Sequence, residues 1–298
     1  YNARQDSYAD RVVRGDIVDR NGNVLAHSEV QADGSEVREY PYGSLFAHVV
    51  GYSDQGKAGL ESEMNFKLLT SNAFFLEKLR NEFQDQKNTG DTVVTTLDVE
   101  LQQAASDALG GNKGAVVVME PDTGKILAMV SKPDFDPGAV SANWEALNSD
   151  PDSALLNRAT QGQYAPGSAF KLVTALEYMR ENPSYDSYSY TCTGAIEQDG
   201  TTIRCYNGHV HGTVNFRDSL AYSCNASFCN IGLSLDISSF RNTAEDLLFN
   251  SSLPSVLPYS KSSFALDESG STADRMMTAM GQGETQVRPY HMALITSA

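Results

Sequence analysis

The chain has few basic residues and no long hydrophobic run, and each shortage excludes a class of protein. Lysine and arginine together number 22 against 38 aspartates and glutamates, which gives a formal net charge of −16 and a sequence pI near 4.6. Such a charge repels nucleic-acid phosphates, so we expect no nucleic-acid partner. No apolar run approaches the roughly 20 residues that a membrane-spanning helix needs.

Metal-binding signatures are also lacking. The sequence holds no Cys-x-x-Cys and no His-Glu-x-x-His, and of its five histidines only His209 and His211 lie close together. Zinc sites recognisable from sequence usually carry their ligands at such short spacings. The sequence therefore predicts neither a metal site nor a cofactor.

The four cysteines fall into two pairs. Cys192 and Cys205 lie almost symmetrically about Gln198-Asp199-Gly200 between strand-like runs, so a hairpin would bring them together. They could then form a disulfide, worth about 3 kcal/mol on a chain-entropy estimate, or remain two free thiols. Cys224 and Cys229 lie in one expected helix with their side chains pointing apart, and we expect both to stay unpaired.

The rest of the composition is that of an ordinary globular protein. Of the 298 residues 41% are hydrophobic and 20% charged, which allows one large domain and a smaller one. The polar cluster at 84–90 is a plausible boundary between them. Residues 1–88 hold short, irregular elements typical of a pedestal or interaction module, and residues 89–298 carry the stronger patterns.

The N-terminal part predicts a hairpin, a short strand and a helix. Residues 16–18 and 24–26 are expected strands joined by the Asn21-Gly22 turn. Residues 48–52 are expected to form a strand, and 58–69 a helix.

The C-terminal part mixes strands and helices. After an expected strand at 91–96, Asp98 is the expected N-cap of a helix that ends at Gly110-Gly111. The apolar runs 114–120 and 126–131 predict an antiparallel hairpin, and a long polar segment at 134–163 follows. Further helices are expected at 169–179, 215–222, 226–235 and 273–280, and from Pro289 to the end of the chain.

Ser168 and Lys171 form the first candidate catalytic pair. They make the only Ser-x-x-Lys of the chain and stand at the start of an expected buried helix. Residues at i and i+3 share a helix face, so a neutral Lys171 amine could take the proton of the Ser168 hydroxyl. The alternative is a helix whose serine is an N-cap and whose lysine is solvated.

Ser223 and Asn225 form a second candidate pair at the junction of two expected helices. The Ser223 hydroxyl could pass a proton to a leaving group, and the Asn225 amide could hold the lysine and bind a substrate carbonyl. The same Ser-x-Asn pattern occurs at Ser141-Ala142-Asn143. We prefer Ser223-Cys224-Asn225 because the other match precedes the nucleophile in a polar loop.

With these motifs the sequence resembles the class B (monofunctional) penicillin-binding proteins, the serine D,D-transpeptidases of peptidoglycan synthesis, in particular members with a small pedestal. The resemblance covers nearly the whole chain. It rests also on segments 14–22, 58–61, 95–98 with 101–102, 114–120 with 123–124, 157–159, 164–171 and 281–283. It implies an α+β fold in which helices flank an antiparallel sheet, as in β-lactamases.

The resemblance also implies a mechanism. Ser168 would attack the penultimate D-Ala carbonyl of a stem peptide that ends in D-Ala-D-Ala, with Lys171 as general base. Ser223 would relay a proton to the departing D-Ala, Asn225 would position Lys171 and the substrate amide, and the Ser168 backbone N–H would stabilise the oxyanion. The acyl group would then pass to an amine of a neighbouring stem. A β-lactam would imitate the D-Ala-D-Ala end and leave a long-lived ester on Ser168.

One part of the family pattern is absent. The third motif of the family, Lys-Thr/Ser-Gly on a strand at the edge of the site, does not occur among the 298 residues. In the family it binds the substrate carboxylate, and its strand supplies the second oxyanion donor. We therefore expect the transpeptidase domain at 89–298 to lack its C-terminal part, and the chain as given to be inactive or weakly acylated.

The family also implies a cellular setting. Because the chain opens on Tyr1 rather than methionine, we expect a membrane anchor before it, a location on the extracytoplasmic face and a role in cell-wall growth and cell shape. A SEDS-type glycan polymerase is the expected partner of the pedestal and anchor.

Two groups of alternatives remain. A D,D-carboxypeptidase or β-lactamase would send the acyl group to water, but such small hydrolases need no pedestal. A β-lactam sensor or non-catalytic scaffold would not need all four candidate residues.

Overall fold

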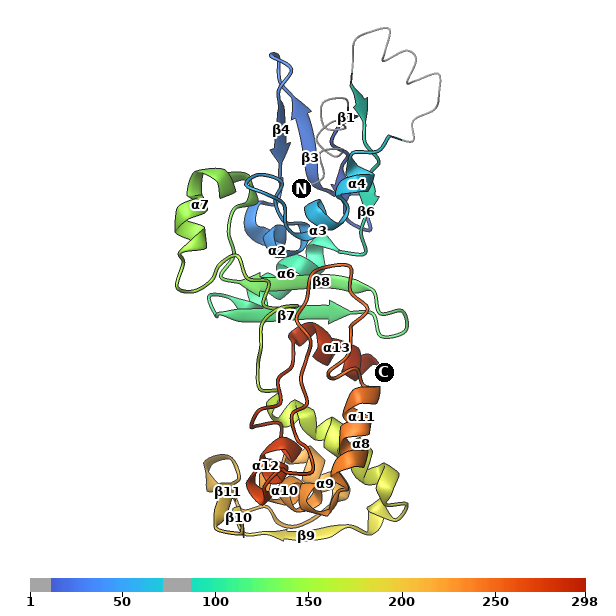
Figure 1. The fold of residues 1–298 in the computed structure, drawn as a ribbon, viewed down its shortest axis with the longest axis vertical. Coiled ribbons are helices and arrows are strands. Elements are labelled where there is room, and N and C mark those ends of the chain that lie inside the picture. The colour runs from blue at the N-terminus through green and yellow to red at the C-terminus, as the bar shows by residue number, and fades with distance from the viewer. Residues whose placement is uncertain (1–11, 72–86) are drawn as a thin grey trace. The chain divides into compact units, whose positions relative to one another are not determined.

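The computed structural model describes residues 12–71 and 87–298, which form two compact units (Figure 1). The first unit contains the described residues up to 162 together with 255–259 and 293–298, and the second contains 163–254 and 260–292. The boundary predicted near residue 88 falls inside the first unit and remains a prediction. Across the described ranges, no helix is both long enough and apolar enough to cross a membrane.

Short strands build the N-terminal part of the first unit. They are β1 (Val12–Val13), β2 (Ile17–Val18), β3 (Val24–Val30), β4 (Glu36–Glu39), β5 (Asn88–Thr89) and β6 (Val93–Val94). Four of them form a sheet in the order β4-β3-β2-β6, in which β2 is antiparallel to β3 and parallel to β6, while β1 pairs with β5. The predicted hairpin through Asn21-Gly22 is confirmed, and β3 and β4 form a second, longer hairpin in Figure 1. The strand expected at 91–96 is shorter than predicted.

Helices replace one predicted strand and divide one predicted helix. They are α2 (Ala47–Val50), α3 (Gly59–Glu63) and α4 (Asn65–Leu68). The prediction of a strand at 48–52 is wrong, because residues 47–50 form the helical turn α2. Every residue of α2 is buried, and a helical turn can bury a short segment on all sides. Its His48 Nε2 lies 2.7 Å from the Ala154 carbonyl oxygen, and its ring packs edge-on against Phe135.

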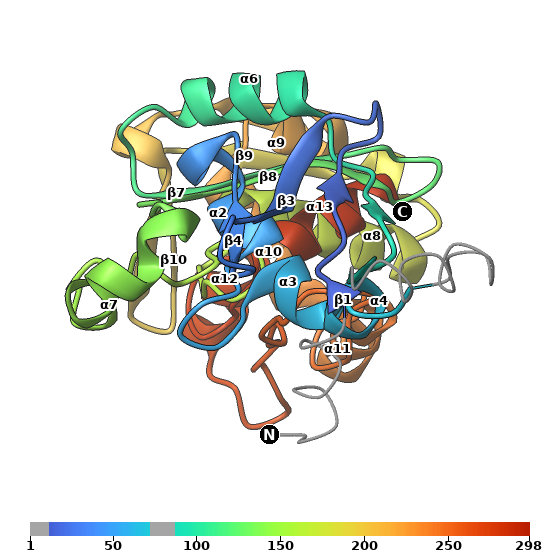
Figure 2. The ribbon, with the colours of Figure 1, turned by 90° about the horizontal axis from the view of Figure 1, so that it is seen from above.

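A helix packed on a hairpin completes the first unit. α6 (Val99–Leu109) lies along the antiparallel pair β7 (Gly114–Met119) and β8 (Ile126–Lys132) in Figure 2. The predicted cap is confirmed, since the Asp98 carboxylate accepts the backbone N–H groups of Glu100 and Leu101. The segment at 134–163 is not all loop as expected, because it contains α7 (Val140–Asn148).

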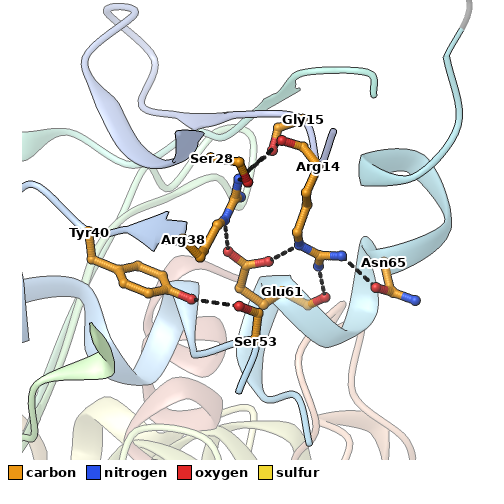
Figure 3. A network of polar contacts seen from close by, with 8 residues as sticks. All are labelled: Arg14, Gly15, Ser28, Arg38, Tyr40, Ser53, Glu61 and Asn65. Carbon is orange, nitrogen blue, oxygen red and sulfur yellow. Dashed lines mark hydrogen bonds and ion pairs between the residues drawn. The ribbon is translucent and has the colours of Figure 1, made fainter. Parts of the chain in front are cut away.

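A buried polar network ties together the segments around the four-stranded sheet (Figure 3). The Glu61 carboxylate is fully buried and accepts Arg14 Nε at 2.5 Å and Arg38 Nε at 2.7 Å. The Arg14 guanidinium also donates to Asn65 Oδ1 at 2.6 Å, and Arg38 donates to the Gly15 carbonyl at 2.9 Å. These contacts connect α3 with β4 and with the residue after β1 through largely buried side chains, which makes Glu61 the central acceptor of this part.

The second unit contains short strands and helices. They are α8 (Lys171–Glu181), β9 (Ser189–Cys192), β10 (Ala195–Gln198), β11 (Thr201–Arg204), β12 (Gly212–Asn215), α9 (Phe216–Ala221), α10 (Asn225–Ser234), α11 (Ile237–Asp246) and α12 (Thr272–Ala279). β9 pairs with β12 and β10 with β11, both antiparallel. The predicted helices are confirmed, including α13 (Pro289–Ser297) from Pro289. Helix α11 was not predicted because its segment is rich in serine and other polar residues, although Phe240, Ala244 and Leu247 recur at helical spacing.

Phenylalanines form the core of the second unit. Phe170 is fully buried, and its ring lies 5.5 Å from that of Phe249, 6.0 Å from that of Phe240 and 6.1 Å from that of Phe264. Aromatic pairs at such distances add to the stabilisation from burial itself. The residue two positions after Ser168 is thereby held in place.

We expect Glu61→Gln to destabilise the first unit by about 3 to 5 kcal/mol, because it leaves two buried guanidinium groups without their counter-charge. Urea unfolding would measure the change. The matched control is Lys113→Gln, which breaks the ion pair between Lys113 and Asp152. The two side chains are 53% and 64% exposed, so this substitution should cost about 0 to 1 kcal/mol. Equal effects of the two substitutions would contradict the central role of Glu61.

Candidate active site

Four predicted residues meet around one amine in the second unit. Lys171 Nζ lies 3.3 Å from Ser168 Oγ, 2.9 Å from Ser223 Oγ and 2.7 Å from Asn225 Oδ1. It also donates to the Ser223 carbonyl oxygen at 2.8 Å. The two candidate pairs, which are far apart in sequence, therefore form a single hydrogen-bonded cluster.

Ser168 is presented by a tight turn rather than by a regular α-helix. Gly167–Phe170 forms a 3₁₀ turn that continues directly into α8, whereas the sequence predicted one helix from 169. In a 3₁₀ turn the side chains at i and i+3 eclipse one another, which places Ser168 over Lys171. Ser168 is exposed and Lys171 is fully buried, so the hydroxyl faces solvent while the amine does not.

Two glycines fix this turn. The Gly167 N–H donates to the Gly281 carbonyl oxygen at 2.7 Å, and Gly167 has φ 57°. A Cβ on Gly281 would lie only 1.9 Å from the Gly167 oxygen. The Gly281-Gln282-Gly283 turn thus contributes to the site through its backbone, a role that its sequence does not reveal.

Ser223 and Asn225 are held by an unusual local backbone. Ser223 has φ 51°, in the left-handed region that non-glycine residues rarely adopt, and this turns its carbonyl toward Lys171. Asn225 opens α10, and its Nδ2 donates to the Arg204 carbonyl at 3.1 Å. That bond orients the amide so that Oδ1 faces Lys171.

The environment of Lys171 favours a neutral amine. Desolvation by burial lowers the pKa of Lys171 from 10.5 to about 8. A neutral amine has two N–H groups and one lone pair, and the Ser223 carbonyl and Asn225 Oδ1 are two acceptors that use the N–H groups. The lone pair is left for a serine hydroxyl, which is the geometry of a general base.

A pocket of about 600 Å³ opens beside the two serines and Asn225. The remaining residues that line it are Tyr206, Asn207, His209, His211 and Tyr222. Tyr206 and Tyr222 are 83% and 58% exposed. Sequence reasoning missed all five because they belong to loops whose convergence depends on the tertiary fold.

Of the two alternatives left open for Cys192 and Cys205, the structure shows two free thiols. The predicted hairpin does bring Cys192 and Cys205 together, but their sulfurs are 3.6 Å apart and both thiols are free, so the disulfide is not formed. Cys224 is also free but lies beside Cys205, and His211 completes a cluster of four side chains able to hold a metal ion. We expected no metal site because the sequence lacks closely spaced ligands. The fold brings together ligand-type side chains that are far apart in the sequence, so the lack of close spacing no longer argues against a site.

The second Ser-x-Asn match has an ordinary structural role. Ser141-Ala142-Asn143 lies on α7 in the first unit, where Asn143 Nδ2 donates to the Ala139 carbonyl at 3.0 Å. The preference for Ser223-Cys224-Asn225 agrees with this placement.

An exposed serine, a buried lysine one turn later and a Ser-x-Asn segment on an α+β domain are the arrangement typical of serine acyl-transfer enzymes that use a lysine base. The chain belongs to the penicillin-binding protein transpeptidase family. The family model for the penicillin binding protein transpeptidase domain matches residues 114–298, and the model for the penicillin binding protein A dimerisation domain matches residues 14–93. The resemblance seen in the sequence is confirmed.

Curated relatives and solved structures agree with this assignment. The chain is 31% identical over 306 residues to the peptidoglycan D,D-transpeptidase PbpA of Mycolicibacterium smegmatis, covering 95% of this chain and 62% of that protein. The structure of penicillin-binding protein A from M. tuberculosis as an imipenem acyl-enzyme complex superposes with a TM-score of 0.87 at 29% identity, over 98% of this chain and 71% of that one. The D,D-transpeptidase domain from Eggerthella lenta gives a TM-score of 0.84 at 31% identity, over 97% and 69% of the two chains. The chain thus spans less than two thirds of the length of this curated relative.

We expect the rate at which Ser168 reacts with a penicillin to rise with pH through about 8, because deprotonation of Lys171 creates the base. Stopped-flow measurement of the acylation rate constant at several pH values would test this. Lys171→Met should react about 10²- to 10⁴-fold more slowly and lose the rise. A wild-type rate that is flat across this range would exclude Lys171 as the titrating base.

We expect Gly281→Ala to slow acylation by about 10²-fold, because its Cβ would displace the Gly167 carbonyl and with it the turn that carries Ser168. The matched control is Gly283→Ala. Both glycines have φ 78°, but the nearest atom to a Cβ on Gly283 is the Met277 Cβ at 3.5 Å. The control should cost about 1 to 2 kcal/mol of stability from the left-handed backbone alone and keep its acylation rate. Equal rates for the two variants would contradict the positioning role.

Proposed function

We propose that the site on this chain serves the acyl-transfer step of peptidoglycan cross-linking, from a stem peptide that ends in D-Ala-D-Ala to an amine of a neighbouring stem, in a protein that also supplies the third motif of the family. The observation that carries the proposal is the Lys171 amine, which lies between Ser168 Oγ and Ser223 Oγ while two carbonyl-type acceptors engage its N–H groups. The relatives named as peptidoglycan D,D-transpeptidases support the substrate class.

The cluster performs the first half-reaction as follows. Ser168 Oγ attacks the penultimate D-Ala carbonyl while its proton passes to Lys171 Nζ, and the Ser168 backbone N–H stabilises the oxyanion. When the tetrahedral intermediate collapses, the peptide C–N bond breaks and Ser223 conveys a proton to the departing D-Ala amine. An ester on Ser168 remains.

The second half-reaction runs in the reverse sense. The acceptor amine attacks the ester carbonyl and loses a proton through Ser223 to Lys171. When the new tetrahedral intermediate collapses, the C–O bond to Ser168 breaks and Lys171 returns a proton to Ser168 Oγ. The second N–H of Asn225 Nδ2 positions the amide of the donor peptide. A β-lactam enters the first half-reaction in place of the donor and stays as the acyl-enzyme, as in the M. tuberculosis relative.

The proposal extends to the organisation of the whole protein. Residues 1–88 would form the pedestal, with the Glu61 network keeping its segments together, and residues 89–298 would form the transpeptidase domain. The family models that match residues 14–93 and 114–298 support a division of this kind. The pedestal and a membrane anchor would hold the enzyme on the extracytoplasmic face and bind a SEDS-type glycan polymerase. This location places the site where its peptidoglycan substrate is found.

We expect benzylpenicillin to add the mass of one ring-opened drug to the full-length protein, with the adduct on Ser168, and Ser168→Ala to show no adduct. Intact-mass and peptide mass spectrometry measure both. Ser141→Ala, which alters the second Ser-x-Asn match, is the control and should label fully. A folded, full-length protein without an adduct would overturn the proposal.

The acceptor distinguishes the transpeptidase from a D,D-carboxypeptidase. With a D-Ala-D-Ala stem peptide and an added amine acceptor, the transpeptidase yields the joined peptide. A carboxypeptidase yields only the shortened stem and free D-Ala, because its acyl group passes to water.

A further inference from the structure

We propose that Cys192, Cys205, His211 and Cys224 bind one zinc ion that holds the Ser223-Cys224-Asn225 segment in its active conformation. The four side chains come from four places in the second unit: the end of β9, the residue after β11, the residue before β12 and the N-cap of α10. Their donor atoms all lie within 4.8 Å of one another.

Three donor–donor distances in the cluster match those of a tetrahedral zinc site, and all the donor atoms lie within 4.8 Å of one another. Zn–S bonds near 2.3 Å and Zn–N bonds near 2.0 Å separate two sulfurs by about 3.8 Å, and a sulfur from a nitrogen by about 3.5 Å. Here Cys192 Sγ lies 3.6 Å from Cys205 Sγ, Cys205 Sγ lies 3.8 Å from Cys224 Sγ, and Cys192 Sγ lies 3.4 Å from His211 Nδ1. An ion at the centre needs only small side-chain adjustments.

The sulfur donors are buried as in a structural site, while His211 lines the pocket beside Ser168 and Ser223. The three thiols are at most 2% exposed, and three cysteines with one histidine are a donor set typical of structural zinc. Backbone N–H groups of Gly194 and Ser227 donate to Cys192 Sγ and Cys224 Sγ, both at 3.4 Å, and such bonds orient and stabilise metal-bound thiolates. The His211 ring lies parallel to that of Tyr222, with 6.1 Å between centroids, which fixes its orientation.

Neither a disulfide nor the ordinary packing of buried thiols accounts for the whole cluster. A Cys192–Cys205 disulfide would bring two sulfurs to within about 2.0 Å of each other. It would not explain why Cys224 and His211 lie against the same two sulfurs. Ordinary packing is represented by Cys229 on the same helix, whose Sγ donates to the Met276 carbonyl and has no imidazole nearby among the described contacts. Each of Cys192, Cys205, His211 and Cys224 lies near three other thiol or imidazole groups, whereas Cys229 does not belong to this cluster.

The ion would act on the catalytic segment through Cys224. Cys224 stands between Ser223, whose φ is 51°, and Asn225, which opens α10. Cys205 follows Arg204, whose carbonyl accepts Asn225 Nδ2. Zinc would thus hold both the strained Ser223 backbone and the partner that orients the Asn225 amide, so the four ligands are positioning residues rather than catalytic ones.

The first test is metal content. Full-length protein purified without chelators should contain about one zinc per chain by atomic emission, and Cys205→Ser and His211→Ala should lose most of it. Cys229→Ala is the matched control, a buried cysteine outside the cluster, and should keep its zinc. Cobalt substitution should give the absorption of a tetrahedral thiolate site in the wild type and not in Cys205→Ser.

The second test uses the wild type alone, so that it does not depend on whether a variant folds. A strong chelator should release the zinc, lower the melting temperature and slow penicillin acylation by about 10²-fold, the cost expected of a small misplacement of the catalytic groups. Added zinc should restore both. Alkylation after denaturation should modify all four cysteines.

Absence of zinc from the wild type, unchanged zinc in Cys205→Ser, or a Cys192–Cys205 disulfide in the alkylation assay would overturn the proposal. The zinc content is measured independently of acylation. Failure of this inference and failure of the proposed transpeptidase function are therefore distinguishable.

Discussion

Burial of the Lys171 amine is the constraint on which the site depends. An ammonium group removed from water is costly unless it is fully paired, and desolvation favours the neutral form. The surrounding oxygens supply hydrogen bonds that keep the side chain in place, while desolvation lowers the pKa of Lys171 to about 8 and so raises the neutral fraction of the amine near neutral pH. The same burial that would destabilise an ordinary lysine therefore produces the base that the chemistry needs.

The rest of the second unit holds oxygens at fixed positions around that amine. Phe170 and its aromatic neighbours fix the start of α8, and the Gly167 to Gly281 hydrogen bond fixes the turn before it. Thr174 Oγ1 donates to the Ala279 carbonyl at 2.8 Å, which ties α8 to α12, and α12 lies beside α10 in Figure 1. Because α10 begins at Asn225, these contacts connect both halves of the catalytic cluster through a short path.

Two small buried clusters lie among short strands and helices. In the first unit the Glu61 carboxylate joins short strands and helices through two arginines. In the second unit three cysteines and a histidine gather the short hairpins beside the pocket. Directional bonds suit such places, since short elements bury too little apolar surface to fix their own arrangement.

Local patterns predicted most of the helices and the two hairpins, because caps, turns and apolar periodicity act within a few residues. Asp98, the Asn21-Gly22 turn and Pro289 are examples. The same patterns failed at α2, where burial on all sides overrides the strand preference of its valines, and at α11, whose sequence is mostly polar apart from one apolar face.

For the site, the sequence by itself determined the candidate residues, since Ser168-x-x-Lys171 and Ser223-x-Asn225 are local motifs whose residue types suit acyl transfer. Only the tertiary structure decided that they share one amine, that Gly281 supports the nucleophile and that Cys192, Cys205, Cys224 and His211 converge. The reason is that each of these depends on contacts between segments distant in the chain. No spacing rule within one segment encodes such contacts, whereas folding brings their atoms within bonding distance.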